Sequence, residues 1–155
     1  MLQARDIMSK DVITTTPETP VNEVAALLEK HRISGVPVVD ADGRIVGIIT
    51  QSDLVSRARD LELPPTIALF DLRLFLETPS HFKKRLEKML GVTVSEVMTP
   101  EPITIPPEMP LQEIAALMAR KKVHTLPVVA GGKLAGVIGK IDLIHAQAQG
   151  GKSEQ

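Results

Sequence analysis

Two related eight-residue phrases hold the polar residues that are best placed for binding chemistry. GIITQSDL covers residues 47–54 and GVIGKIDL covers residues 136–143. Each phrase carries a carboxylate, Asp53 or Asp142, and in the first phrase the hydroxyl of Thr50 precedes that carboxylate by three residues. This spacing is typical of a helix N-terminal cap, and a helix N-terminus also favours anions. The phrases therefore have two interpretations that can coexist, a cap and a ligand contact.

Residue types that catalyse reactions or bind metals are scarce. The chain has no cysteine, and its four histidines stand apart in sequence: His31, His81, His124 and His145. No nucleophile elbow, H-E-x-x-H motif or Walker-type phosphate loop is present, and the Gly131-Gly132 pair is typical of a turn. We therefore expect no metal site, no required cofactor and no enzymatic activity.

Composition narrows the class of partner. The formal net charge of the 155-residue chain is −1 and charges of both signs are mixed, so no overall electrostatic pattern favours a nucleic acid partner, and we expect no membrane partner. No apolar run approaches the ~20 residues that a membrane span needs, and the first residues lack the apolar core of a signal peptide. We expect a cytoplasmic protein whose partner is a small molecule or another protein.

An internal repeat predicts the helices and strands that position these two phrases. A shift of 90 residues matches the chain onto itself, and a one-residue deletion in a turn changes the shift to 89. In each copy a proline precedes apolar residues at helical spacing, which predicts an amphipathic helix after Pro20 and after Pro110. A β-branched run containing Pro37 or Pro127, a glycine turn and a second apolar run then predict a hairpin.

Each copy is completed by two further elements. A brief strand is expected at residues 12–15 and 103–105, and a second helix is expected to begin near Ser52 and near Ile141. The predicted fold class is α+β, with two β-α-β-β-α repeats packed with pseudo-two-fold symmetry because one such unit would struggle to bury its own sheet. The predicted domains are a first repeat at 1–56, a helical insert at 57–93, a second repeat at 94–147 and a disordered tail at 148–155.

The insert contains one clear amphipathic pattern, SHFKKRLEKML. Phe82, Leu86 and Leu90 share one helical face, and lysines share the other. The apolar face predicts packing against the repeats or across a homodimer interface. The basic face has two interpretations, a solvated surface and a contact with an acidic partner or nucleic acid, which would give the protein a transcriptional role.

The order of the motifs resembles the cystathionine β-synthase (CBS) domain family, which occurs as tandem pairs. The residues that carry the resemblance are D-I-M-S and E-V-M-T at the starts, S-G-V-P-V-V-D and H-T-L-P-V-V-A before the hairpins, and the two phrases at the ends. Together they cover about residues 4–56 and 94–147. The resemblance implies a Bateman module that binds an adenosine nucleotide (AMP, ADP or ATP) or a related adenosyl ligand and commonly forms a homodimer.

The resemblance also implies the ligand contacts. The family motif G-h-x-[ST]-x-x-D, in which h is apolar, matches Thr50 and Asp53, and its aspartate would hold the ribose hydroxyls. The first site would add residues of the other repeat, with His124 as the phosphate contact: Pro102, Ile103, Thr104, Val123, His124, Thr125 and Leu126. The second site would combine one aspartate with residues of the first repeat: Asp142, Val12, Ile13, Thr14, Ser34, Gly35 and Val36.

The second site departs from the pattern, because Gly139 has no hydroxyl and Ser34 is not basic. Loss of one neutral hydrogen bond costs ~1 kcal/mol, so we expect this site to be weaker or empty. The leading hypothesis is a stand-alone regulatory sensor, with a regulated partner protein as its possible target. The alternative is a dimerisation or scaffolding module whose ligand sites are vestigial.

Overall fold

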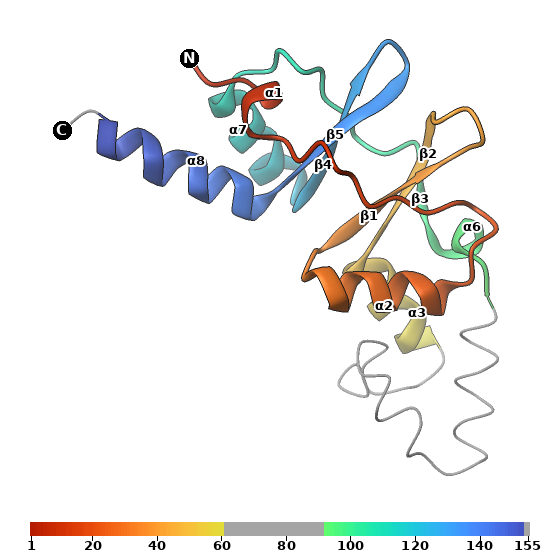
Figure 1. Ribbon diagram of the computed structural model, residues 1–155. Coiled ribbons are helices and arrows are strands. Elements are labelled where there is room, and N and C mark those ends of the chain that lie inside the picture. Colours follow the sequence, from red (N-terminus) through yellow and green to blue (C-terminus); the bar gives the residue numbers. More distant parts are fainter. Residues whose placement is uncertain (61–91, 154–155) are drawn as a thin grey trace. The chain divides into compact units, whose positions relative to one another are not determined.

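The computed structural model describes residues 1–60 and 92–153, and its contacts divide the chain into two compact units (Figure 1). The first unit comprises Thr14–Asp42 and the described residues of Val46–Glu101. The second comprises Met1–Ile13, Gly43–Ile45 and the described residues of Pro102–Gln155. The α+β class is confirmed, because each unit combines helices with an antiparallel sheet.

The first unit contains the long elements of the first repeat. Helix α2 (Val21–His31) is followed by strands β1 (Gly35–Val39) and β2 (Ile45–Thr50) and by helix α3 (Gln51–Asp60). Helix α6 (Val94–Val97) and strand β3 (Thr99–Pro100) come from the start of the second repeat. The strands lie in the order β1-β2-β3, so β2 is central.

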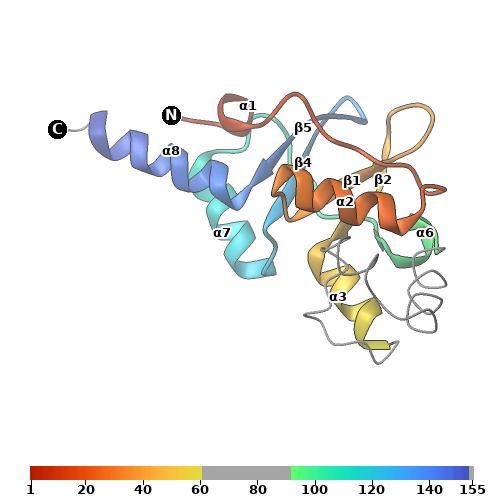
Figure 2. The same ribbon diagram turned by 60° about the horizontal axis from the view of Figure 1, so that its bottom comes forward.

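The second unit repeats this arrangement with the roles of the two repeats exchanged. It contains helix α1 (Ala4–Ile7), helix α7 (Leu111–Lys121), strands β4 (Thr125–Ala130) and β5 (Lys133–Gly139), and helix α8 (Lys140–Ser153). Strands β4 and β5 form the predicted hairpin, with Thr125 paired to Gly139 and a register shift between Val128 and Val129. Figure 2 shows α8 continuing directly from the end of β5.

The amphipathic helices α2 and α7 are confirmed, with their starts moved by one residue. Pro20 and Pro110 are N-cap residues in extended conformation, and helical geometry begins at the next residue. Both helices end at a residue in the left-handed region, Arg32 with φ 51° and Lys122 with φ 54°. These basic ends are also favourable for the negative pole of the helix dipole.

The short first strands are reduced to single bridges. Thr15 pairs with Val38 in parallel orientation, and Ile105 pairs with Val128 in the same way. The prolines of the hairpins fit this arrangement, since the carbonyl of Pro37 accepts a hydrogen bond from Thr15 and no proline amide is needed. The prediction of strands at 12–15 and 103–105 was too long, because in the described part of the chain the pairing of these segments is limited to Thr15 and Ile105.

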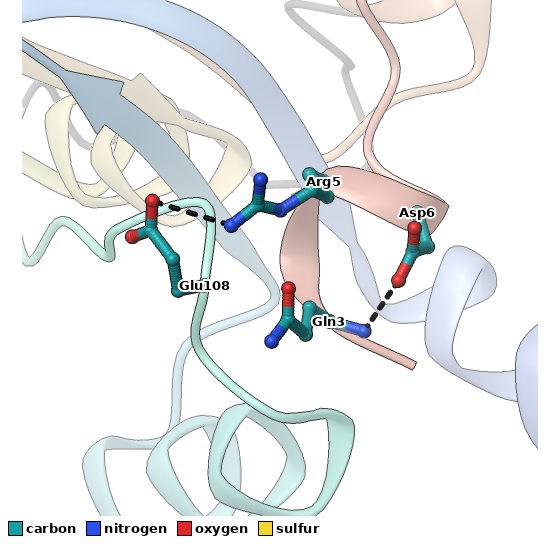
Figure 3. Close-up of polar contacts among 4 residues, drawn as sticks. All are labelled: Gln3, Arg5, Asp6 and Glu108. Carbon is teal, nitrogen blue, oxygen red and sulfur yellow. Dashed lines mark hydrogen bonds and ion pairs between the residues drawn. The ribbon is translucent and has the colours of Figure 1, made fainter. Parts of the chain in front are cut away.

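Two short helices, α1 and α6, were not predicted from the sequence. Each begins with a capping box, in which Asp6 Oδ2 accepts from the Gln3 amide at 2.8 Å and Glu96 Oε2 accepts from the Thr93 amide at 2.8 Å. Figure 3 shows the first of these boxes. It also shows Arg5, which forms a 3.3 Å ion pair with Glu108 in the same unit.

The leading segment of each repeat belongs to the unit that holds the hairpin of the other repeat. Met8 lies against Gly136 of β5, and Met98 lies against Gly47 of β2. At both glycines an added Cβ would meet the methionine sulfur at 2.5 Å. These glycines therefore permit a close approach of the leading segments to β5 and β2.

Each unit has its own hydrophobic core, built from apolar side chains at corresponding positions of the two repeats. In the second unit the core contains Ala4, Ile105, Ile114, Met118, Leu126, Val128, Ile138 and Leu143. In the first unit the corresponding fully buried side chains include Val21, Val24, Leu28, Val36, Val38, Ile49 and Leu54. The last core residue of each hairpin, Ile49 or Ile138, lies directly before the position that starts the candidate site.

The end of the second repeat differs from the prediction. Helix α8 continues to Ser153, so the disordered tail expected from residue 148 is wrong for residues 148–153. Ala and Gln at positions 146–149 are good helix formers, which explains the helix as far as residue 149, whereas Gly150 and Gly151 are poor helix formers and the last residues have no explanation in the sequence. The predicted helical insert at 57–93 falls almost entirely on residues 61–91, which lie outside the described residues. Within the described part of the chain, no helix combines the length and hydropathy that crossing a membrane requires.

Candidate functional site

The junction of β2 and α3 carries the first candidate site. Strand β2 ends at Thr50 and helix α3 begins at the next residue, so the Thr50 amide and Asp53 face one another across the first helical turn. The Thr50 amide donates to Asp53 Oδ2 at 2.9 Å, and the Asp53 amide donates to Thr50 Oγ1 at 3.3 Å. The capping interpretation of the sequence is therefore confirmed, and the cap fixes the carboxylate in position.

The hydroxyl of Thr50 adds a second bond to the same oxygen. Thr50 Oγ1 donates to Asp53 Oδ2 at 3.1 Å, which leaves the other carboxylate oxygen for different partners. Thr99 Oγ1 donates to that second oxygen, Oδ1, also at 3.1 Å. Sequence reasoning missed Thr99, although it is the last residue of the E-V-M-T motif and pairs with Ile48 across the sheet.

The segment before the first hairpin also lies at this junction. The Gln51 amide donates to the carbonyl of Ser34 at 2.9 Å, and the Gln51 side chain donates to the carbonyl of Ile33 at 3.3 Å. Ser34 was predicted for the second site, but in the structure its backbone is bonded beside Thr50 in the first unit. Its assignment to a site with Asp142 remains a prediction.

The junction of β5 and α8 repeats the geometry with fewer side-chain donors. The Gly139 amide donates to Asp142 Oδ2 at 2.7 Å, as the Thr50 amide does to Asp53. The Lys140 amide donates to the carbonyl of His124 at 3.0 Å, in the place where Gln51 meets Ser34. Among the described residues, no side chain donates a hydrogen bond to Asp142.

Gly139 is not required by space or by backbone conformation. A Cβ added there would meet Asp142 Oδ2 at 3.7 Å and the His124 carbonyl at 3.9 Å, both ordinary contacts. Its φ is not in the left-handed region, unlike those of Gly131 and Gly132. A hydroxyl side chain at position 139 would therefore fit, and its absence is a property of the sequence alone.

Burial separates the other predicted contacts into two groups. Val36 and Leu126 are 0% exposed and belong to the cores, so only their backbone atoms are available to a ligand. Ile103 is 36% exposed and His124 is exposed, so their side chains are accessible. Thr50 and Asp53 are brought together in the first unit, whereas Pro102, Ile103, Thr104 and residues 123–126 belong to the second.

For the second predicted site the division is reversed. Asp142, Val12 and Ile13 belong to the second unit, and Thr14 with residues 34–36 belongs to the first. The combination of residues from both units at either site thus remains a prediction. Among the described residues, no three histidine, aspartate or glutamate side chains gather as potential metal ligands.

Residues 4–60 and 94–149 each match the CBS domain family, so the chain belongs to this family and contains two of its repeats. It is 34% identical over 150 residues to the protein MJ1426 of Methanocaldococcus jannaschii, covering 92% of this chain and 89% of that one.

Two solved structures of similar fold are complexes with adenosyl compounds. CBSX2 in complex with AMP is 24% identical, with a TM-score of 0.72 and coverage of 96% of this chain and 98% of that one. The CBS domain pair of MJ0100, in complex with 5′-methylthioadenosine and S-adenosyl-L-methionine, is 26% identical. Its TM-score is 0.70, with 98% of both chains covered. The overall likeness extends over nearly the whole chain in both cases.

Proposed function

We propose that this protein is a stand-alone regulatory module that binds an adenosine nucleotide or a related adenosyl ligand. The observation that carries the proposal is the placement of Asp53 and Asp142 at the first turns of α3 and α8, where a backbone amide fixes each carboxylate. An ionised carboxylate in this position accepts hydrogen bonds from two neighbouring hydroxyls, which is the chemistry of a ribose diol.

The remaining contacts are assigned by the family motif. At the first site Thr50 stands beside Asp53, the backbone of Ile103 and Thr104 would flank the base, and the exposed His124 would meet a phosphate. At the second site Asp142 would act with residues 12–14 and 34–36. The helix N-termini beside both carboxylates favour the phosphate end of a nucleotide.

The two relatives that hold AMP, methylthioadenosine or S-adenosylmethionine support an adenosyl ligand for the same fold. We assign no reaction to the chain. Regulation requires that the ligand bind two states of the protein with different affinity, and a homodimer or a partner protein would supply the second state.

A thermal-shift panel tests the ligand class. AMP, ADP, ATP, S-adenosylmethionine and NADH are compared on the wild-type protein and on Asp53→Ala, with Asp42→Ala in an exposed turn as the matched control. A ligand at about 100 times its dissociation constant should add ~2.7 kcal/mol to the free energy of unfolding. A response that Asp53→Ala reduces and Asp42→Ala retains supports the first site, whereas no response to any ligand contradicts the adenosyl proposal.

A second function is favoured by one observation, the internal hydrogen bonds that already occupy Asp53. A carboxylate satisfied by its own chain serves equally well as a structural cap in a dimerisation or scaffolding module without a ligand. Analytical ultracentrifugation separates the two functions. A dimer of unchanged affinity with and without every ligand of the panel supports the scaffold, and a ligand-dependent change supports the sensor.

A further inference from the structure

The hydrogen bonds of the two aspartates are unequal. From the residues that the structure describes, Asp53 accepts three hydrogen bonds: from the Thr50 amide, from the Thr50 hydroxyl and from the Thr99 hydroxyl. Within the described part of the chain, Asp142 accepts one hydrogen bond, from the Gly139 amide at 2.7 Å. An ionised carboxylate offers about four acceptor positions. The described residues therefore leave about one acceptor position open on Asp53 and most of them open on Asp142.

A ribose diol needs two acceptor positions on one carboxylate, so it can engage Asp53 fully only if a present donor leaves. The Thr50 amide is fixed by the backbone at the β2–α3 junction, and the Thr50 hydroxyl is held by the cap with the Asp53 amide. Thr99 is exposed, and its hydroxyl can turn away by rotation about one side-chain bond. Thr99 is thus the donor that can be displaced at least cost.

The Thr99 bond is also unnecessary for orienting Asp53. Two donors on Oδ2 and the amide cap already define the direction of the carboxylate. Asp142 lies at the same position in the first turn of its helix, held, among the described residues, by its amide hydrogen bond alone. Ser9 is the counterpart of Thr99, because it pairs with Val137 as Thr99 pairs with Ile48. No hydrogen bond joins Ser9 to Asp142 in the described part of the chain.

We propose that the Thr99 hydroxyl is a built-in competitor of the ligand at Asp53, which lowers the affinity of the first site for a ribose diol. This inference rests on the proposed function, because it concerns the affinity of the same site. It modifies the expectation that the first site is the stronger one. The hydroxyl of Thr50 adds a polar group to that site, but the hydroxyl of Thr99 takes up an acceptor position that the ligand needs. Asp142, with no such competitor, is the more accessible acceptor.

The test isolates the first site in an Asp142→Ala background and titrates AMP and 2′-deoxy-AMP by calorimetry. Thr99→Val removes the donor and keeps the β-branched shape, so AMP should bind about fivefold more tightly. The affinity for 2′-deoxy-AMP, which lacks the diol, should change less. Thr99→Ser restores a hydroxyl and should return AMP binding to the parent value, which a purely structural role of Thr99 would not predict.

The counterpart in the other repeat is the control. Ser9→Ala, measured in an Asp53→Ala background, should leave AMP binding at Asp142 unchanged. Unchanged or weaker AMP binding by Thr99→Val overturns the competitor role while leaving the proposed function in place. If the Asp142→Ala parent binds no AMP but the wild type does, Thr99→Val must restore binding, and failure to restore it also overturns the inference. Only the absence of a response to every ligand of the panel removes the proposed function itself.

Discussion

Thr99 and Asp53, one on the edge strand β3 and the other in the first turn of α3, are joined by a 3.1 Å hydrogen bond from Thr99 Oγ1 to Asp53 Oδ1. The bond links the start of the second repeat to the candidate ligand contact of the first. Ser9, which occupies the same register beside β5, makes no such bond to Asp142 within the described residues. The two repeats therefore share a backbone design but differ in how their carboxylates are occupied.

The buried hydroxyl of Thr15 gives the first prediction. Thr15 is 5% exposed and its Oγ1 has no hydrogen-bond partner among the described residues, while the equivalent Ile105 is apolar and 1% exposed. Replacing a buried, unsatisfied hydroxyl by a methyl group removes a desolvation cost, so Thr15→Val should raise the free energy of unfolding by about 1 kcal/mol. Urea denaturation measures the change. Ile105→Thr should lower stability, and a loss of stability in Thr15→Val would show that the hydroxyl has a partner in solution.

The contact between Gly47 and Met98 gives the second prediction. A Cβ at Gly47 would lie 2.5 Å from Met98 Sδ and 3.0 Å from the carbonyl of Thr99, so Gly47→Ala should cost about 1–3 kcal/mol by overpacking. Gly139→Ala is the matched control, because a Cβ there meets only ordinary contacts. Thermal unfolding compares the two variants. Equal midpoints would mean that the leading segment does not lie against β2 as the structure shows.

The caps of α3 and α8 give the third prediction. Thr50→Ala removes the side-chain acceptor of the Asp53 amide and should cost about 1 kcal/mol. Gly139→Ser introduces the missing hydroxyl at a position with no left-handed backbone and should stabilise the protein by about 0.5–1 kcal/mol. Denaturant unfolding of both variants tests the pair. Destabilisation by Gly139→Ser would indicate that glycine is needed at this junction for another reason.

The helices and hairpins could be predicted because their signals are local. The apolar spacing after Pro20 and Pro110 and the β-branched runs around Pro37 and Pro127 act within a few residues, and an internal repeat lets each copy support the other. The capping interpretation of Thr50 and Asp53 was equally local and is confirmed.

The exchange of the leading segments could not be predicted, because it depends on contacts between residues far apart in sequence. No residue near Met98 or Met8 indicates which glycine each methionine will contact. Helices α1 and α6 are too short to show a hydrophobic periodicity. Thr99 was missed for the same reason. Its bond to Asp53 exists only because β3 pairs with β2, which places Thr99 opposite Ile48.

Calorimetric titration of AMP into the wild-type protein and into the Asp53→Ala/Asp142→Ala double variant tests the central claim most directly. The claim is that the carboxylates in the first turns of α3 and α8 receive the ribose diol of an adenosyl ligand. The account predicts binding heat for the wild type and none for a double variant that remains folded by circular dichroism. A folded double variant that binds AMP with the wild-type dissociation constant would contradict it.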